Sequence, residues 1–414
     1  MKLYRDISTL LTLAQAAAKG GRSPQLEDLS PISKAAIVVH NKKIAWCGPL
    51  RHLPRPLWQK IRSEQSLQGR VVLPGFVECH THSLFAGSRA EEFESRLRGA
   101  SYREIAAAGG GILSTMRATR KASRGALLRL TQQRIDRFVS QGITTLEVKT
   151  GYGLSREAEL KCLRVLTDLK KSNRIHLVRT FLGAHAKPPE YPTPADYLQF
   201  LTTEMLPLVR KRQLAERVDI FVENGFFSAS EAAWYLEAAR QLGFATTVHA
   251  DQISLSGGTL AAVQAGALSA DHVIQIRGPE IAALASSDTT AVLLPAADIY
   301  MQCEFPPARA LIDAGARVAL ATDFNPGTSP TQSVDWVGLL ARLEMKMSLA
   351  EVLVAWTLNP AYALGLEKVK GSLAVGKDAD FISIFGDWQE LFYSVGSHSL
   401  AEVHCGGKRL FKAE

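Results

Sequence analysis

Two histidines separated by one residue, His80 and His82, are the first residues whose types and spacing suggest chemistry. Side chains two positions apart project to the same side of an extended segment, so both imidazoles could reach one metal ion. By itself such a pair is more often two surface or packed histidines. A third imidazole, His249, and a carboxylate, Asp323, follow other apolar segments. The four together predict three nitrogen ligands and one oxygen ligand, a set that suits zinc or a similar divalent ion.

An ion with an open coordination position would make this a hydrolytic site, because it lowers the pKa of a bound water and polarises a carbonyl. Asp323 and His272 are the candidates for the proton transfers. His272 could instead only orient Asp323 or a ligand histidine. Lys149 could carry a carboxylate bridge between two ions, but we favour a structural or electrostatic lysine and therefore a single ion.

The elements that must position these residues follow a regular pattern. Short apolar, β-branched segments alternate with longer helical stretches, which is the signature of repeated βα units. There are eight such segments: 71–76, 143–148, 175–182, 218–222, 245–248, 268–273, 291–294 and 317–321. Eight repeats over about 290 residues favour an α/β fold of the (β/α)₈ barrel type, although periodicity alone leaves an open doubly wound sheet possible. Both ends of the chain instead carry short β-rich segments separated by turn residues.

Histidines gather where a barrel would place its active site. Five of the ten histidines, His80, His82, His185, His249 and His272, follow or end a predicted strand. The C-terminal ends of barrel strands form one face, so these side chains are expected to meet there.

The composition is that of an ordinary globular chain, with 46% hydrophobic and 21% charged residues among 414. The net charge of +8 is scattered, without a basic stripe or a reader motif, so we expect no nucleic-acid partner and a small anionic substrate. Five widely spaced cysteines indicate neither a disulfide framework nor a Cys-x-x-Cys zinc site, which favours a cytoplasmic location. No apolar segment approaches the length that spans a membrane.

Ten segments carry a more specific pattern. They are LPGFVECHTH at 73–82, RAEEFE at 89–94, GASY at 99–102, AGGGILST at 108–115, KTGYGL at 149–154, FLGAH at 181–185, PPEY at 188–191, HADQ at 249–252, SADH at 269–272 and ATDFNPGTSP at 321–330. Over almost its whole length the chain therefore resembles the imidazolonepropionases, the histidine-degradation members of the amidohydrolase superfamily. The general framework is shared with many deaminases and cyclic amidases, whereas the glycine-rich, KTGYGL and NPGT segments are specific to this family.

The resemblance implies a (β/α)₈ barrel domain over 70–365 and a small β-sandwich domain formed from 1–69 and 366–414. It implies hydrolysis of the ring amide of 4-imidazolone-5-propanoate to N-formimidoyl-L-glutamate by a metal-activated water. One zinc or iron ion, a homodimer and a cytoplasmic location belong to the same expectation.

The resemblance also assigns site residues. The family's metal positions fall on His80, His82, His249 and Asp323. Its substrate and product contacts fall on Arg89, Tyr152, His185, Asn325, Gly327 and Thr328. A propanoate calls for a guanidinium such as that of Arg89, whose donor fork suits a carboxylate better than a lysine does; a surface arginine is the alternative. Gln252 stands where some members have glutamate, and its amide can hydrogen-bond to the ring but cannot act as a base.

The expected mechanism follows from these positions. Water deprotonated towards His272 or Asp323 attacks the ring carbonyl, and Asp323 returns a proton to the leaving ring nitrogen. One alternative is another cyclic amidase or aminohydrolase of the superfamily. A second is a non-catalytic scaffold, which the retention of all four metal ligands argues against.

Overall fold

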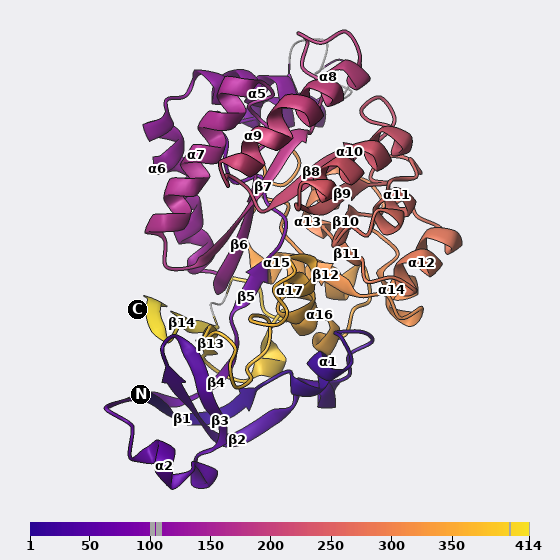
Figure 1. The fold of residues 1–414 in the computed structure, drawn as a ribbon. Helices are drawn as coiled ribbons and strands as arrows, with labels where there is room; N and C mark the ends of the chain where they lie inside the picture. Colours follow the sequence, from indigo (N-terminus) through magenta and orange to yellow (C-terminus); the bar gives the residue numbers. More distant parts are fainter. Residues whose placement is uncertain (100–103, 105–109, 397–398, 414) are drawn as a thin grey trace.

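Two β-sheets organise the chain in the computed structural model, which describes residues 1–99, 104, 110–396 and 399–413 (Figure 1). One sheet has eight strands and is surrounded by helices, and the other has seven strands from both ends of the chain. Parts of two sequence segments, 100–102 of GASY and 108–109 of AGGGILST, lie outside the described residues.

The eight-stranded sheet is a parallel barrel. Its strands are β5 (Phe76–Glu78), β6 (Ile143–Lys149), β7 (His176–Ala184), β8 (Arg217–Val222), β9 (Ala245–Ala250), β10 (Ser269–His272), β11 (Thr290–Leu293) and β12 (Val318–Leu320). They pair in chain order. Just past the edge strands, Thr81 forms a parallel bridge with Phe324, and the N–H of His82 donates to the carbonyl of Phe324 at 2.9 Å. These contacts join β12 to β5, so the predicted (β/α)₈ barrel is confirmed.

The first barrel strand differs from the sequence prediction. The apolar run at 71–76 predicts one strand, but residues 71–74 belong to β4 (Ser63–Pro74) of the other sheet, and the barrel begins beyond Gly75. A Cβ at Gly75 would lie 2.4 Å from the side chain of Thr144, so the chain passes between the two sheets at a point of close contact. Residues 71–78 are buried on both sides of Gly75, in β4 as well as in β5. The apolar run therefore continues from one sheet into the other.

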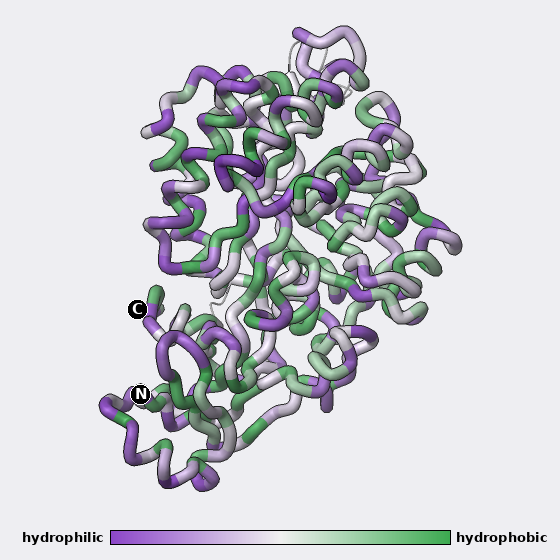
Figure 2. The backbone as a smooth tube through the Cα atoms, viewed as in Figure 1, coloured by the Kyte–Doolittle hydropathy of each residue, from purple (hydrophilic) through white to green (hydrophobic). Residues whose placement is uncertain are grey.

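Helices cover the outside of the barrel (Figure 1). Apart from α3 (Ala90–Leu97), which lies at the active-site cavity, the helices are α5 (Ile112–Lys121), α6 (Arg124–Val139), α7 (Arg156–Ser172), α8 (Pro194–Phe200), α9 (Leu206–Lys211), α10 (Ala229–Gln241), α11 (Gly258–Gln264), α12 (Gly278–Ala285), α13 (Pro295–Met301), α14 (Ala308–Asp313), α15 (Val334–Leu343), α16 (Leu349–Ala355) and α17 (Leu358–Ala363). A π-helical turn, Leu201–Met205, joins α8 to α9. Short hydrophobic and hydrophilic stretches follow one another along the outer helices in Figure 2. This is expected for helices that bury one face and expose the other.

The second sheet combines both ends of the chain. Its order is β15 (Lys408–Lys412), β14 (Leu400–Cys405), β13 (Phe381–Ile384), β4, β1 (Lys2–Leu11), β2 (Pro31–His40) and β3 (Lys43–Pro49). Short helices α1 (Ala14–Ala18) and α2 (Arg55–Trp58) and 3₁₀ turns at Leu26–Leu29, Leu50–His52 and Trp388–Glu390 connect to these strands. Tyr4 packs edge-on against Phe381 and His404, with ring centroids 5.0 and 5.3 Å apart, which ties the two ends together. The domain boundaries at 69/70 and 365/366 stay a prediction.

Two further observations concern the chain as a whole. Within the described residues, no helix has the length and apolar character needed to cross a membrane. All five cysteines are free thiols.

Candidate metal centre and active site

The four predicted metal ligands meet at the C-terminal ends of the barrel strands. His80 and His82 follow β5, His249 is the penultimate residue of β9, and Asp323 follows β12. The Nε2 atoms of His80 and His82 each lie 3.4 Å from Oδ1 of Asp323. The Nε2 atoms of His82 and His249 are 3.3 Å apart. All four side chains are buried. These distances show that the structure brings together the four residues that the sequence predicts to converge.

These separations fit a single four-coordinate ion. Ligand atoms about 2.0–2.1 Å from a tetrahedrally bound zinc ion lie roughly 3.3–3.4 Å from one another. Within the described residues, Nε2 of His80 and Oδ1 of Asp323 are buried without a hydrogen-bond partner. Such atoms cost free energy unless a cation contacts them. The donor set therefore fits one divalent ion.

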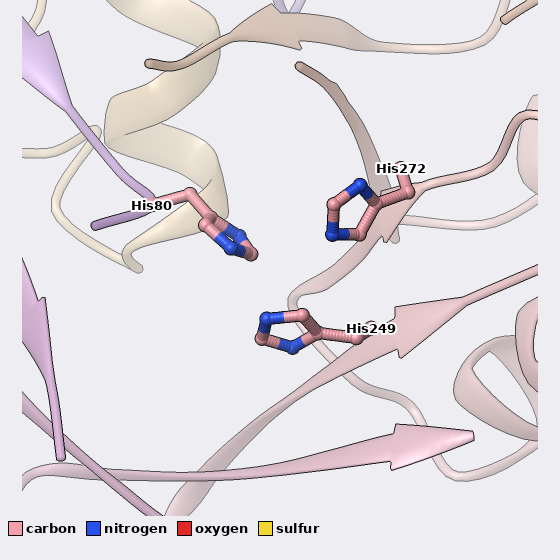
Figure 3. Close-up of side chains that lie close together, drawn as sticks. All are labelled: His80, His249 and His272. Carbon is pink, nitrogen blue, oxygen red and sulfur yellow. The ribbon is translucent and has the colours of Figure 1, made fainter. Parts of the chain in front are cut away.

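His272, at the end of β10, lies beside this set. Figure 3 shows its ring facing His80 and His249, and the three histidines can bring one nitrogen each to within 4.8 Å of the others. The backbone φ angles of His272 and Asp323 are 75° and 52°, a left-handed conformation that costs energy for residues with a side chain. The two groups predicted to transfer protons are thus both held in strained positions at strand ends.

Buried carboxylates orient the ligand histidines. Nδ1–H of His80 donates to Oδ2 of Asp271 at 2.6 Å, and Nδ1–H of His249 donates to Asp219 at 3.1 Å. With its proton on Nδ1, each imidazole keeps the Nε2 lone pair for a metal. Nζ of Lys149 lies 2.9 Å from Asp219 and 3.7 Å from Asp271. Lys149 therefore balances the carboxylates behind the histidines, in agreement with the electrostatic role predicted for it.

Two more buried glutamates fix the backbone under the ligands. Glu78 accepts hydrogen bonds from the N–H groups of His80 and Thr322, both at 3.0 Å, and so joins β5 to the segment after β12. Glu147 accepts from the N–H of Thr81 at 3.2 Å. Sequence reasoning missed both residues, although an acidic residue inside an otherwise apolar strand is a signal that could have found them.

Burial sets the protonation of the site. It lowers the pKa of His80, His82 and His272 well below the ordinary value, so these imidazoles are neutral, the state in which they bind a metal. Burial raises the pKa of Asp323 to about 7. For Lys149, burial acts to lower the pKa, but the surrounding carboxylates raise it above the ordinary value, so the ammonium stays charged.

A cavity of about 460 Å³ opens onto the metal ligands. Its lining residues are His82, Arg89, Glu92, Arg96, Ile112, Tyr152, His185, Phe221, Phe226, His249, Gln252, Ile253, His272, Met301, Gln302, Asp323, Asn325 and Thr328. Every predicted substrate contact except Gly327 is among them. The apolar part of the wall and the charged pair Glu92 and Arg96 were not predicted as site residues, although Glu92 lies within the RAEEFE segment.

Arg89 lies at the N-terminus of α3 and packs against Gly327. A Cβ at Gly327 would come 2.0 Å from Nη1 of Arg89, so a side chain at this position would displace the guanidinium from its present place. Nε–H of Arg89 donates to Oε2 of Glu92 at 2.8 Å. Arg96, two turns further along α3, donates to the carbonyl of Gly327 at 3.3 Å. Gly327 thus acts through its contacts with two arginines rather than as part of the cavity wall.

The side chain of Asn325 shapes the loop after β12. Its Oδ1 accepts from the N–H groups of Gly327 and Thr328, both at 2.8 Å. Its Nδ2 donates to the carbonyl of Asp323 at 2.7 Å. The side-chain amide of Asn325 therefore holds the loop that contains Gly327 and Thr328 next to Asp323.

His185 and Tyr152 line the cavity near His82. The ring of His185 stacks on that of His82, with centroids 5.0 Å apart and planes 18° apart. Nδ1–H of His185 donates to the carbonyl of Gly151 at 3.1 Å, which leaves Nε2 as an acceptor. Burial lowers the pKa of His185 to about 3, so the ring is neutral. Nε2 of Gln252 donates to Sδ of Met301 at 3.4 Å.

Comparison with known proteins decides the family. A model of the amidohydrolase family matches residues 106–387. An imidazolonepropionase of Bdellovibrio bacteriovorus is 56% identical over 410 residues, which cover 99% of this chain and 96% of the relative. The chain belongs to the imidazolonepropionase family. A second imidazolonepropionase, from Rubrobacter xylanophilus, is 46% identical over 388 residues, or 92% of each chain. The family predicted from the sequence is confirmed, and with it a hydrolase that acts on C–N bonds.

Solved structures with the same fold are more distant than these imidazolonepropionases. An adenosine deaminase from Xanthomonas campestris with bound zinc has a TM-score of 0.71 at 17% identity, covering 99% of this chain and 92% of that one. The guanine deaminase of E. coli has a TM-score of 0.72 at 15% identity, covering 100% and 99%. These likenesses show the fold. Together with the donor set described above, the family indicates a divalent metal.

Proposed function

We propose that the chain hydrolyses the ring amide of 4-imidazolone-5-propanoate to N-formimidoyl-L-glutamate. One observation carries the proposal: a donor set for a divalent ion and a guanidinium for a carboxylate face the same cavity of about 460 Å³. Such a cavity accommodates a small ring that carries an acidic tail.

A divalent ion held by His80, His82, His249 and Asp323 supplies an activated water and polarises the ring carbonyl. In the reaction the water oxygen bonds to the carbonyl carbon, and the bond from that carbon to the ring nitrogen breaks. The new carboxyl group loses a proton, and the released nitrogen gains one. The protein must therefore take a proton from the water side and deliver one to the nitrogen.

His272 and Asp323 serve these proton transfers. Both line the cavity beside the other metal ligands, and His272, as an imidazole, can accept and release a proton. Asp323 is both the oxygen donor of the ligand set and a cavity-lining carboxylate, which places it to receive a proton from the water side and pass it on. Either of the two residues takes the first proton from the water. Asp323 then delivers a proton to the leaving ring nitrogen.

The remaining wall orients the substrate. Arg89 binds the propanoate, and Tyr152, His185 and Gln252 bind the ring by hydrogen bonds or contact. Asn325, Gly327 and Thr328 form the loop near the product carboxylate. The neutral His185 offers an acceptor nitrogen without adding a charge to the ring site.

Several finer assignments belong to the same proposal. The ion is zinc or iron, with one ion per chain, and the working form is a homodimer in the cytoplasm. The residues 1–69 and 366–414 form the accessory domain, and 70–365 form the catalytic one.

The direct test incubates the purified chain with 4-imidazolone-5-propanoate. Loss of the substrate's ultraviolet absorbance together with N-formimidoyl-L-glutamate in the mass spectrum is the expected result. Release of ammonia from a purine or pyrimidine, with the imidazolone left intact, would instead favour an aminohydrolase. Less than about half an equivalent of bound metal and no hydrolysis of either kind would favour a scaffold.

A further inference from the structure

Glu92 lies on α3 between the two arginines that line the cavity, and each of its carboxylate oxygens has its own partner. Oε2 accepts from Nε–H of Arg89 at 2.8 Å. Oε1 accepts from the N–H of Gly111, immediately before α5, at 3.1 Å. The side chain of Glu92 is 17% exposed and that of Arg89 10%, so water competes only weakly for these bonds.

The bond to Glu92 determines how Arg89 presents its guanidinium. Glu92 occupies Nε, and Gly327 packs against the Nη1 side. Among the described residues, no hydrogen-bond partner occupies Nη1 or Nη2 of Arg89, which lines the cavity. A guanidinium fixed at Nε and open at its outer nitrogens is a donor fork ready for a carboxylate.

Charge alone would give Glu92 the opposite effect. A carboxylate at the cavity wall repels an anionic substrate, so its removal would strengthen substrate binding if Glu92 acted only through its charge. If Glu92 instead holds the fork of Arg89, its removal weakens binding because the guanidinium must be ordered when the substrate binds. The sign of the change in KM therefore separates the two roles.

We propose that Glu92 is a positioning residue that sets the affinity for the substrate carboxylate by holding the guanidinium of Arg89 against Gly327. This inference rests on the proposed function, in which Arg89 binds the propanoate. Glu92 acts on substrate binding and not on the bond-breaking step, because its contacts are with Arg89 and Gly111 rather than with any metal ligand.

The test uses Glu92→Gln and Glu92→Ala in the full-length metal-loaded enzyme. Glu92→Ala should raise KM about 10-fold, the usual effect of losing a hydrogen bond to a charged group, with kcat within about twofold of wild type. Glu92→Gln keeps one acceptor oxygen and should raise KM less. The matched control is Glu94→Gln, an exposed glutamate of the same helix, which should leave both constants unchanged. A lower KM in Glu92→Gln, or a fall in kcat at constant KM, would overturn the proposal.

An Arg89→Ala background shows whether Glu92 works through Arg89. In that background Glu92→Ala should have no further effect on KM, whereas full additivity of the two changes would contradict the proposal. Calorimetric binding of N-formimidoyl-L-glutamate gives a readout independent of turnover, and it should weaken by the same factor. If the wild-type chain does not hydrolyse the imidazolone, the proposed function fails by itself, while the binding series still decides the role of Glu92. Unchanged circular dichroism and metal content exclude misfolding of the variants.

Discussion

The two sides of the active-site cavity are built in different ways. On the metal side, the ligands stand at strand ends, and buried carboxylates hold the ring nitrogens of His80 and His249 that face away from the ion. On the substrate side, Arg89 belongs to a helix and Asn325 to a loop, and they are held by a partly exposed carboxylate and by backbone amides. The metal side is therefore part of the barrel core, whereas the substrate side is attached to it.

The same barrel fold occurs in enzymes named for other ring compounds. Adenosine and guanine deaminases with 15–17% identity have the same fold, so the barrel supports chemistry on other rings. Residues on loops and on the first turns of helices can change without disturbing the sheet. We therefore expect damage to the metal side to abolish the chemical step and damage to the substrate side to change affinity.

The largest effect is expected at Asp323, which the proposal uses both as a ligand and as a proton carrier. Asp323→Asn should lower kcat by about 10³-fold, because an amide is a poor ligand and cannot carry the proton. Steady-state kinetics with the imidazolone and metal analysis of the same preparation measure the effect. Asp313→Asn, at an exposed position on α14, is the control. A kcat within tenfold of wild type would remove Asp323 from the mechanism.

Next in size is the loss of a carboxylate behind a ligand. Asp271→Asn should weaken metal binding about 10- to 100-fold, because Nδ1 of His80 loses the partner that fixes its tautomer and orientation. Competition with a chromogenic chelator measures the metal affinity of the variant. An unchanged affinity would mean that the backbone, through Glu78, orients His80 without help from Asp271.

On the substrate side, Arg89→Lys should raise KM about 10- to 100-fold and change kcat much less. A lysine keeps the charge but loses the two-pronged contact with a carboxylate. The measurement is the separate determination of kcat and KM. If kcat fell while KM stayed constant, Arg89 would belong with the metal side, and the two sides of the cavity would not differ in this way.

The smallest effect on activity is expected in the second sheet, which contributes to neither side. Phe381→Leu loses ring contacts with Tyr4 and His404, whose centroids lie 5.0 and 4.5 Å away. It should lower the free energy of unfolding by about 1–2 kcal/mol and leave kcat and KM unchanged. Urea unfolding measures the free energy of unfolding, and steady-state kinetics of the same preparation measure kcat and KM. Altered kinetics would show that this sheet influences the active site.

Much of this architecture could be predicted from the sequence because local patterns specify it. Apolar β-branched runs mark seven of the barrel strands, and the spacing of His80 and His82 marks the metal side. The first strand was misplaced because the buried run at 71–76 crosses from one sheet to the other at Gly75, and hydrophobicity does not record which sheet buries a residue.

The supporting residues of the site could not be predicted in the same way. Asp219 contacts His249 from the neighbouring strand, and that contact depends on strand register, which a single sequence does not fix. Glu92 and Arg96 lie three and seven residues after Arg89, so one helix face carries all three. Their contacts with Gly111 and Gly327 join segments distant in sequence, and only the folded chain reveals them.

The most direct test of the single-ion site is activity measured against bound metal. The enzyme is stripped with a chelator, zinc or ferrous iron is restored in steps, and metal per chain is determined together with imidazolone hydrolysis. A site formed by three histidines and Asp323 predicts no hydrolysis by the stripped enzyme and a linear rise that stops at one equivalent per chain. Full activity after complete metal removal, or a requirement for a second equivalent, would contradict it.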